Sequence, residues 1–274
     1  MHSKHGEADL ASPPQPKSES VIITPKSQTP IRLMSCNIQA GNTTRKFSEY
    51  ISRGWSHLLP GGKRHTLKSL AQISTPFDVV GLQECDPGSL RSGFTNQTNF
   101  LAELGEFPYW SHQANRSIAN IASSANAVLS RVEPTEVLDY PLPGRMGGRG
   151  VLLCQFGNGE QAWHLAVTHL ALGLPSRIAQ ISFLSELLAN KKRLVLMGDF
   201  NCAYDSPEMH QLFRQTSLQP PPEKLATYPS WQPSRSLDHI FYSGFRLNDY
   251  RVLPAGNSDH LAVAVELSPN DAAQ

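Results

Sequence analysis

The sequence contains no long apolar run. No stretch approaches the roughly 20 consecutive apolar residues that a membrane-spanning helix needs. The apolar run Val21–Ile23 near the start is also too short for the core of a signal peptide. We therefore expect a soluble, cytoplasmic protein without a transmembrane segment.

Cysteine is scarce, with four residues in a chain of 274, and no two of them have CxxC spacing. This argues against a cysteine-based zinc site or a redox pair. All four lie within or beside predicted strands, where we expect buried free thiols that pack as small apolar side chains in a reducing compartment: Cys36, Cys85, Cys154 and Cys202.

A strong charge of one sign is missing as well. The formal net charge is +1, so the chain has no bulk attraction to polyanions, and nucleic acid is one candidate partner among several. The segment 42–68 is a local exception, because six Lys or Arg residues accompany a single acid, Glu49, and are interleaved with Phe47, Tyr50 and Trp55. This composition fits nucleic-acid binding, an anionic lipid surface or an ordinary surface helix.

The sequence does contain enough apolar material for one sizeable core. Hydrophobic residues make up 39% of the chain, and a single α/β domain commonly reaches about 250 residues. Residues 1–30 mix Pro, Ser, Lys, Glu and Gln, which is typical of a flexible tail. We expect one folded domain over residues 31–268 and a short C-terminal tail over 269–274.

The most informative segment is Leu194–Asn201, an apolar strand that reaches a glycine and then delivers a carboxylate and a carboxamide. On extended backbone, side chains two positions apart share one face, so we expect Asp199 and Asn201 to point at the same ligand. Such groups at a strand end suit a phosphate and a hard metal ion.

The same pattern of an apolar strand with polar residues at one end recurs along the chain. Polar strand ends are common in α/β proteins, where ligands bind off the sheet edge, so one instance carries little weight. Together they form a constellation, whose further members are Ile31–Asn37, Asp78–Glu84, Trp163–His169, Leu237–Phe241 and Ser258–Val265.

These segments, in this order, resemble the motifs of the endonuclease/exonuclease/phosphatase family, the deoxyribonuclease-I-like metal-dependent phosphoesterases. The resemblance runs from Ile31 to Leu267 and implies a four-layer α/β sandwich, in which two packed mixed β-sheets are flanked by helices. The matching segments are Ser35–Ile38, Leu82–Glu84, Asn126–Arg131, Thr168–Leu170, Gly198–Asn201, Leu237–Phe241 and Ser258–His260.

The resemblance also implies that an activated water hydrolyses a phosphate ester with the help of Mg²⁺ or Mn²⁺. Mg²⁺ prefers oxygen ligands and keeps several waters, so one or two carboxylates suffice to hold it. We predict Glu84 as the first metal ligand, with Asn37 beside it and Asp259 as a further ligand.

Activation of water requires a base, and Asp199 is our candidate, with Asn201 holding a phosphoryl oxygen or the water through its amide. His260 needs an acceptor that sets its tautomer, and the resemblance implies that Asp238 supplies it. His169 matches the histidine that family members use to protonate the leaving group or to stabilise the phosphate. The division of acid and base duties between the two histidines stays open.

Four further residues have weaker claims to a functional role. Arg149 precedes a predicted strand and could reach a phosphate. We interpret Arg177 and Gln180 as helix-surface or loop-bracing residues, and His239 as a packed, hydrogen-bonded histidine rather than a ligand.

Apolar spacing predicts helices over 64–74, 96–105, 175–190 and 207–216, with Leu104 and Ile178 on their buried sides. Strands are predicted at the motif segments and also over 125–130, 151–156 and 162–168. The stretch 243–257 is predicted to connect the strands of the last two motifs.

The leading interpretation is a nuclease-like phosphodiesterase that acts as a monomer. A phosphatase or a lipid phosphodiesterase of the sphingomyelin type would use the same site, and a catalytically silent binding module is the rival from another class. The reactive set argues against the silent module because all of its members are present: Asn37, Glu84, His169, Asp199, Asn201, Asp238 and His260.

Overall fold

The computed structural model describes residues 29–38, 60–88, 96–118, 122–144, 148–254 and 258–270. The predicted N-terminal tail up to residue 28 and the last four residues of the C-terminal tail lie outside the described residues. Of the basic and aromatic segment 42–68, the described part begins at residue 60, as the start of a helix.

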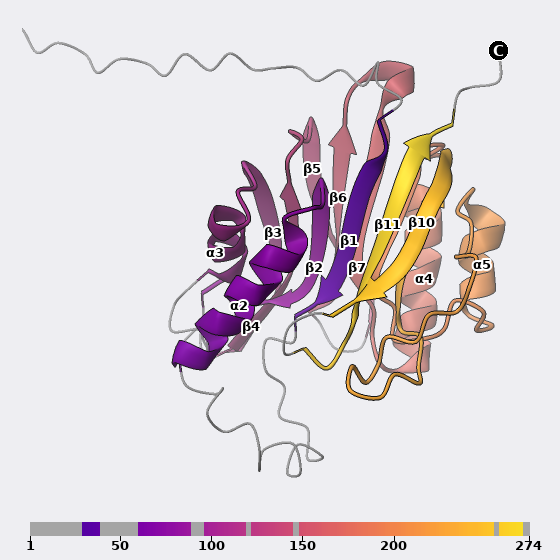
Figure 1. The fold of residues 1–274 in the computed structure, drawn as a ribbon. Helices are drawn as coiled ribbons and strands as arrows, with labels where there is room; N and C mark the ends of the chain where they lie inside the picture. The colour runs from indigo at the N-terminus through magenta and orange to yellow at the C-terminus, as the bar shows by residue number, and fades with distance from the viewer. Residues whose placement is uncertain are drawn as a thin grey trace, which may run out of the picture.

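Eleven described strands form two mixed sheets that pack face to face (Figure 1). The six-stranded sheet has the order β10-β11-β1-β2-β4-β3, and the five-stranded sheet has the order β5-β6-β7-β8-β9. The strands are β1 Ile31–Asn37, β2 Val79–Cys85, β3 Tyr109–Ile118, β4 Ala122–Ser130, β5 Glu136–Pro141, β6 Gly150–Phe156, β7 Trp163–His169, β8 Leu194–Asp199, β9 Asp238–Ser243, β10 Phe245–Leu253 and β11 Ala262–Pro269.

Helices cover the outer face of each sheet and complete four layers (Figure 1). Helices α2 (Pro60–Ser74) and α3 (Gln97–Leu104) pack on the six-stranded sheet. Helices α4 (Leu174–Leu188) and α5 (Met209–Gln215) pack on the five-stranded sheet. The predicted four-layer α/β sandwich is confirmed.

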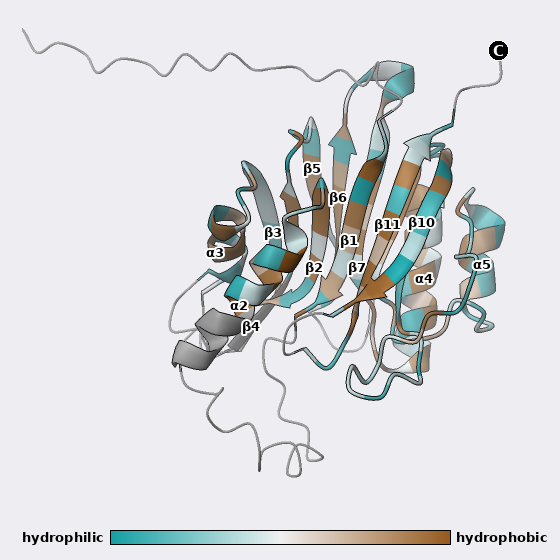
Figure 2. Cartoon of the chain, in the orientation of Figure 1, coloured by the Kyte–Doolittle hydropathy of each residue, from teal (hydrophilic) through white to brown (hydrophobic). Residues whose placement is uncertain are grey.

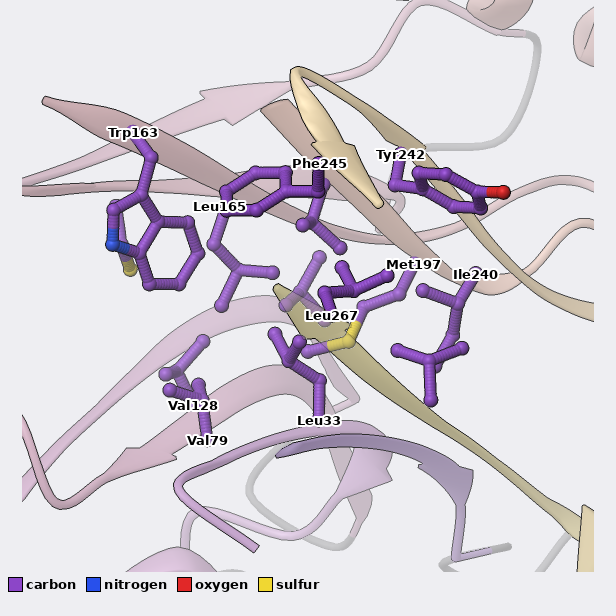
Figure 3. Close-up of a cluster of buried hydrophobic side chains, with 14 of the residues drawn as sticks. Leu33, Val79, Val128, Trp163, Leu165, Met197, Ile240, Tyr242, Phe245 and Leu267 are labelled. Atoms are coloured by element: carbon purple, nitrogen blue, oxygen red, sulfur yellow. The ribbon is translucent and has the colours of Figure 1, made fainter. Parts of the chain in front are cut away.

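The central strands are apolar on both faces, because one face meets the opposite sheet and the other meets helices. In β1, Leu33 belongs to the cluster between the sheets, whereas Met34 belongs to the cluster under α2 and α3. Figure 3 shows the cluster between the sheets, where Leu33 and Val79 approach Leu165 and Met197. In Figure 2, brown hydrophobic bands recur along β1 and β2, whereas the edge strand β10 is largely hydrophilic.

Strand direction brings the polar strand ends together at one end of the sandwich. β1 runs parallel to β2, and β7 runs parallel to β8, so the carboxyl ends within each pair coincide. β11 is antiparallel to β1 and β9 is antiparallel to β8, which brings the amino ends of β9 and β11 to the same place. β1 contacts both β8 and β9 across the sandwich, so the two sets of ends meet.

Three strands were not predicted, and all three are sheet edges. These are β3 and β10 at the edges of the six-stranded sheet and β5 at an edge of the five-stranded sheet. The prediction that 243–257 is a connection was therefore wrong over β10. Edge strands bury fewer side chains, as the exposed pattern of β5 illustrates, so their hydrophobic pattern is weak.

The predicted helices are present with shifted ends. α3 lies closest to its prediction, because Asn96 caps its start by accepting a hydrogen bond from the backbone N–H of Asn99, and Gly105 follows its end. Leu104 and Ile178, which were expected on buried sides, are exposed. Leu104 is the last residue of α3 and Ile178 lies near the start of α4, where fewer neighbours cover a side chain.

Within the described part of the chain, no helix is both long and apolar enough to cross a membrane.

Candidate active site

The residues predicted for catalysis and metal binding lie together at the end of the sandwich where the strand ends meet. Oδ2 of Asp199 is at the centre of this group. It lies 3.0 Å from Nδ2 of Asn37, 3.3 Å from Nε2 of His169 and 3.9 Å from Nε2 of His260. Asn37 donates a hydrogen bond to Asp199, so the centre links β1 of one sheet to β8 of the other.

The turn after β8 differs from the prediction. Gly198 has φ +151°, and a Cβ there would collide with the carbonyl oxygen of Thr168, so only glycine lets β8 approach β7 this closely. β8 ends at Asp199, and Asn201 has φ +54°, so the expectation of two side chains on one extended face was wrong. The backbone N–H of Asn201 instead donates to Oδ1 of Asp199, and its amide donates to the carbonyl of Leu170, both at 2.9 Å.

Asp238 and His260 form the pair that the resemblance implied. Oδ2 of Asp238 accepts a hydrogen bond from Nδ1 of His260 at 2.8 Å. With Nδ1 on this carboxylate, Nε2 of His260 is directed towards Asp199. All three side chains are buried, so the geometry is held by the protein and not by solvent.

Thr227, which sequence analysis did not single out, supports this pair. Its buried hydroxyl donates to Oδ2 of Asp238 at 2.6 Å and accepts from the backbone N–H groups of Leu237 and Asp238. Thr227 lies in an irregular segment before β9, where no periodic pattern marks it. The hydroxyl therefore fixes the Asp238 carboxylate through contacts that only the fold creates.

Ser258 was also missed, although it adjoins Asp259 in the last motif. Its hydroxyl donates to the backbone carbonyl of Asn37 at 2.6 Å and accepts from the backbone N–H of His260 at 3.1 Å. It therefore ties the end of β1 to the segment that carries His260.

Glu84 occupies an irregular position at the end of β2. The pairing of β2 with β4 shifts register between Leu82 and Cys85, and Glu84 has φ +60°. A left-handed conformation is strained for a residue with a side chain, and such strain clusters at functional sites. Burial raises the pKa of Glu84, while the positive charge of Arg149 and a hydrogen bond from Asn37 act in the opposite direction.

His169 contacts two of the site carboxylates. Its Nδ1 lies 3.9 Å from Oε1 of Glu84, and its Nε2 lies 3.3 Å from Oδ2 of Asp199. Burial, together with the positive charges of Arg149 and His260, holds the pKa of His169 well below its usual value. Its imidazole is therefore neutral at neutral pH, so the 3.3 Å contact with Asp199 is not an ion pair.

The pKa values of Asp199 and His260 are shifted upwards. Burial raises the pKa of Asp199 to about 7, and the charge of Asp238 adds to this effect. Burial alone would lower the pKa of His260, but the carboxylates of Asp238, Asp199 and Asp259 raise it to about 10. At neutral pH, His260 is consequently cationic.

Asp259 lies beside His260, with its Oδ1 4.0 Å from Nε2 of the imidazole. This buried oxygen has no hydrogen-bond partner, and burial raises the pKa of the carboxyl. A buried carboxylate oxygen without a donor is destabilising unless a cation or a water satisfies it.

Among the described residues, one group of buried ligand atoms is compact enough for a metal ion, since these atoms all lie within 4.8 Å of one another. It comprises Asp199, Asp238 and His260. Within this group, however, Asp238 and His260 already share a hydrogen bond. A cation there would have to displace the proton that joins them.

The set predicted from the sequence offers a different donor chemistry. Glu84 and Asp259 contribute carboxylates with raised pKa values, Asp259 has an oxygen without a partner, and Asn37 contributes an amide oxygen. Oxygen donors of this kind suit Mg²⁺ or Mn²⁺. The donor chemistry of these residues therefore suits the implied metal.

Arg149 lies close to the site because the next residue, Gly150, is held by hydrogen bonds. The carbonyl of Gly150 accepts hydrogen bonds from Nδ2 of Asn126 at 2.8 Å and from the hydroxyl of Thr168 at 3.1 Å. The charge of Arg149 lowers the pKa of both Glu84 and His169. Its guanidinium thus contributes positive charge at this end of the sandwich.

The residues that we interpreted as supports have that role in the structure. Arg177 donates to the carbonyls of Ala171 and Leu172, and Gln180 accepts from the backbone N–H of Ala171, so both brace the loop after β7. His239 is buried with Nε2 2.9 Å from the carbonyl of Cys202, and burial lowers its pKa to about 4. The four cysteines are free and buried, as predicted.

Comparisons with known proteins agree with this architecture. The profile described as the Endonuclease/Exonuclease/phosphatase family matches residues 34–260. A search of curated proteins finds no significant match.

Several solved structures share the fold. One is an endonuclease/exonuclease/phosphatase family protein from Bacteroides thetaiotaomicron, with 19% identity, a TM-score of 0.64, and coverage of 88% of this chain and 98% of that one. A mannosyl-6-phosphatase of the same species has 21% identity, a TM-score of 0.62 and coverage of 86% and 99%. A humanized TDP2 of D. rerio has 14% identity, a TM-score of 0.65 and coverage of 88% and 100%.

The family match begins inside β1 and ends at His260, so it includes every residue of the site described above. This protein therefore belongs to the endonuclease/exonuclease/phosphatase family.

Proposed function

We propose that this protein is a divalent-metal-dependent phosphoesterase that hydrolyses a phosphodiester by in-line attack of an activated water. The observation that carries the proposal is the position of Asp199, whose Oδ2 lies among Asn37, His169 and His260. A carboxylate with a raised pKa, a neutral imidazole and a cationic imidazole within 4 Å provide a base and hydrogen-bond donors of different strength.

Asp199 is the proposed base for the attacking water. A pKa of about 7 lets its ionised form accept a proton at neutral pH. The backbone N–H of Asn201 orients this carboxylate through Oδ1. Oδ2, which also accepts from Asn37, is the oxygen that would take the proton of the water. One amide N–H of Asn201 donates to the carbonyl of Leu170, and the other remains to hold a phosphoryl oxygen.

His260 is the proposed cationic donor to the phosphate. Asp238 holds the proton on Nδ1, so the N–H at Nε2 is directed into the site, where it can stabilise charge on a phosphoryl oxygen. His169, being neutral, would donate or accept a hydrogen bond at the leaving-group side. The charge difference between the two histidines thus supports a division of labour that the sequence left open.

Glu84, Asn37 and Asp259 would hold a Mg²⁺ or Mn²⁺ ion, whose chemistry there would be to neutralise the negative charge that develops on the phosphate. The strained backbone of Glu84 and the unpartnered oxygen of Asp259 support these two as ligands.

The charge of the site favours a diester over a monoester. Among the described residues, Arg149 and His260 are the cations that act on the site carboxylates. They oppose the carboxylates of Glu84, Asp199, Asp238 and Asp259. A diester carries one negative charge and a monoester dianion two, so the side chains alone, before the charge of a bound metal ion is added, repel the diester less.

The test is a hydrolysis screen of the purified protein in Mg²⁺, in Mn²⁺ and in chelator, run beside His260→Ala. The panel contains bis-p-nitrophenyl phosphate, p-nitrophenyl phosphate, plasmid and single-stranded DNA, RNA, sphingomyelin and inositol phosphates. We expect metal-dependent cleavage of diesters that disappears in the variant. Preference for p-nitrophenyl phosphate would indicate a phosphatase, and complete inactivity in the presence of metal would contradict the proposal in favour of a binding module.

A further inference from the structure

The most exposed large apolar side chains of the described residues all lie at the site end of the sandwich. Leu172, Trp231, Leu174 and Ile178 are 77%, 61%, 49% and 47% exposed, and we call them the apolar rim. The next most exposed large apolar residue is Leu104, at 42%. Concentration of exposed apolar side chains around a site marks an interaction surface.

Three members of the rim lie in the segment that comes after His169. β7 ends at His169, and Leu172, Leu174 and Ile178 belong to the loop and the first turns of α4 that come next. The start of this loop is fixed to the site, because Leu170 donates its backbone N–H to the carbonyl of Asp199. The rim therefore lies beside the reacting groups.

Trp231 lies on the His260 side of the site. Its neighbour Ser230 donates its backbone N–H to the carbonyl of Asp259 at 2.7 Å and its hydroxyl to the carbonyl of Ser258 at 2.7 Å. The ring of Tyr228, in the same segment, lies 5.0 Å from that of His260. The rim thus flanks the site on both the His169 side and the His260 side.

The loop after β7 is rigidly held while it presents its leucines to solvent. The buried guanidinium of Arg177 donates to the carbonyls of Ala171 and Leu172 at 3.1 and 2.9 Å, and also to Glu208. Gln180 accepts a hydrogen bond from the backbone N–H of Ala171 and donates one to the carbonyl of Pro143. Leu172 is therefore exposed because the backbone is braced in that position.

The chemistry of the rim identifies its partner. Residues 170–176 carry no charged side chain, so they offer nothing to a phosphate backbone, which binds through Lys and Arg. A leucine that is 77% exposed stands out from the surface and does not line a pocket. Protruding leucine, isoleucine and tryptophan side chains fit the boundary between headgroups and acyl chains of a lipid layer.

We propose that the apolar rim docks the site end of this protein on a zwitterionic lipid surface, with Leu172, Leu174, Ile178 and Trp231 inserted at the interface. Such docking would place phosphate esters at that surface within reach of Asp199 and His260. The docking itself requires no hydrolysis, so it holds or fails independently of the proposed function.

The test is co-sedimentation of the full chain with phosphatidylcholine vesicles over a range of lipid concentrations. We compare the wild type with the double variant Leu172→Asn/Leu174→Asn and with Leu104→Asn, a matched leucine on α3. The double variant should lower the partition coefficient by at least about tenfold, because burial of a leucine is worth that much or more. Leu104→Asn should leave it unchanged.

Circular dichroism and thermal unfolding show whether each variant is folded, and Trp231→Ala gives a second test at a different position. The Trp231→Ala variant should bind more weakly and lose part of the blue shift of tryptophan fluorescence that vesicles cause. Equal binding by the folded double variant, an equal loss in Leu104→Asn, or no binding by the wild type would overturn the proposal. Binding to anionic vesicles or DNA alone would also overturn it, in favour of an electrostatic partner.

Discussion

The His260 side and the Glu84 side of the site differ in how far the protein completes them. On the His260 side, Oδ2 of Asp238 receives hydrogen bonds of 2.6 Å from Thr227 and 2.8 Å from His260. On the Glu84 side, Glu84 has a strained backbone and a raised pKa. Asp259, whose charge acts on both Glu84 and His260, keeps a buried oxygen without a partner.

This difference indicates what each side is organised to do. The hydrogen bonds to Oδ2 of Asp238 hold a proton in a defined place, although Oδ1 of the same carboxylate is buried without a partner. The side with uncompensated carboxylates carries a cost that a bound cation would relieve. Asp199 lies between them, bonded to Asn37 on one side and 3.9 Å from His260 on the other.

The largest expected effect on kcat comes from removing the imidazole of His260. His260→Ala should lower kcat for bis-p-nitrophenyl phosphate by about 10³-fold, since positioned acid–base groups contribute 10²–10⁴-fold. Metal affinity, measured by calorimetry, should stay within a few-fold of the wild type. A comparable loss of metal affinity would remove the distinction between the two sides.

Removing the charge of Glu84 should have a smaller effect, which depends on the metal concentration. Glu84→Gln keeps the shape of the side chain but removes its charge, so activity at low Mn²⁺ should fall by about 10²-fold and recover in part as Mn²⁺ is raised. A titration of rate against metal concentration measures this. Asp249→Asn, a change at a half-buried acid on β10 that pairs with Arg251, should leave the titration unchanged.

Thr227→Val tests the support of the His260 side. The valine keeps the volume but leaves Asp238 without one donor and two backbone N–H groups without their acceptor. We expect kcat to fall by about tenfold and the free energy of unfolding to fall by about 1–3 kcal/mol. Thr227→Ser, which restores the hydroxyl, should recover both quantities, and failure of that rescue would argue against the hydrogen bond as the cause.

The smallest effect is a change of stability with pH. The folded pKa of His260, about 10, is above its unfolded value of about 6.5. Its contribution is thus fully present below the unfolded pKa and is lost as pH rises through the folded pKa. The Tm advantage of the wild type over His260→Gln in chelator should therefore shrink steadily between about pH 6.5 and pH 10, measured by thermal unfolding. A constant or growing advantage would mean that His260 is not cationic.

The sequence predicted best the features that depend on local pattern and motif order. The long buried strands β1, β2, β7 and β8 were predicted from their apolar runs, because both of their faces are covered. The edge strands β3, β5 and β10 were missed, since side chains at an edge are partly exposed and give a weak pattern.

Within the site, the sequence indicated which residue types to expect but not how they contact one another. Asp199 and Asn201 are joined by a hydrogen bond from the backbone N–H of Asn201, across a turn at φ +54° and not along an extended strand. Thr227 could not be found, because its role arises from a contact with Asp238 that exists only once an irregular segment packs against β9. The different charges of His169 and His260 depend on burial and neighbouring groups, which no motif encodes.

Calorimetric titration of Mn²⁺ into the wild type, Glu84→Gln and His260→Gln tests the division of the site most directly. The proposed assignment predicts that the wild type and His260→Gln bind the ion with similar affinity, whereas Glu84→Gln loses most of its binding. Loss of binding in His260→Gln with retention in Glu84→Gln would contradict it, and would place the ion among Asp199, Asp238 and the imidazole at position 260.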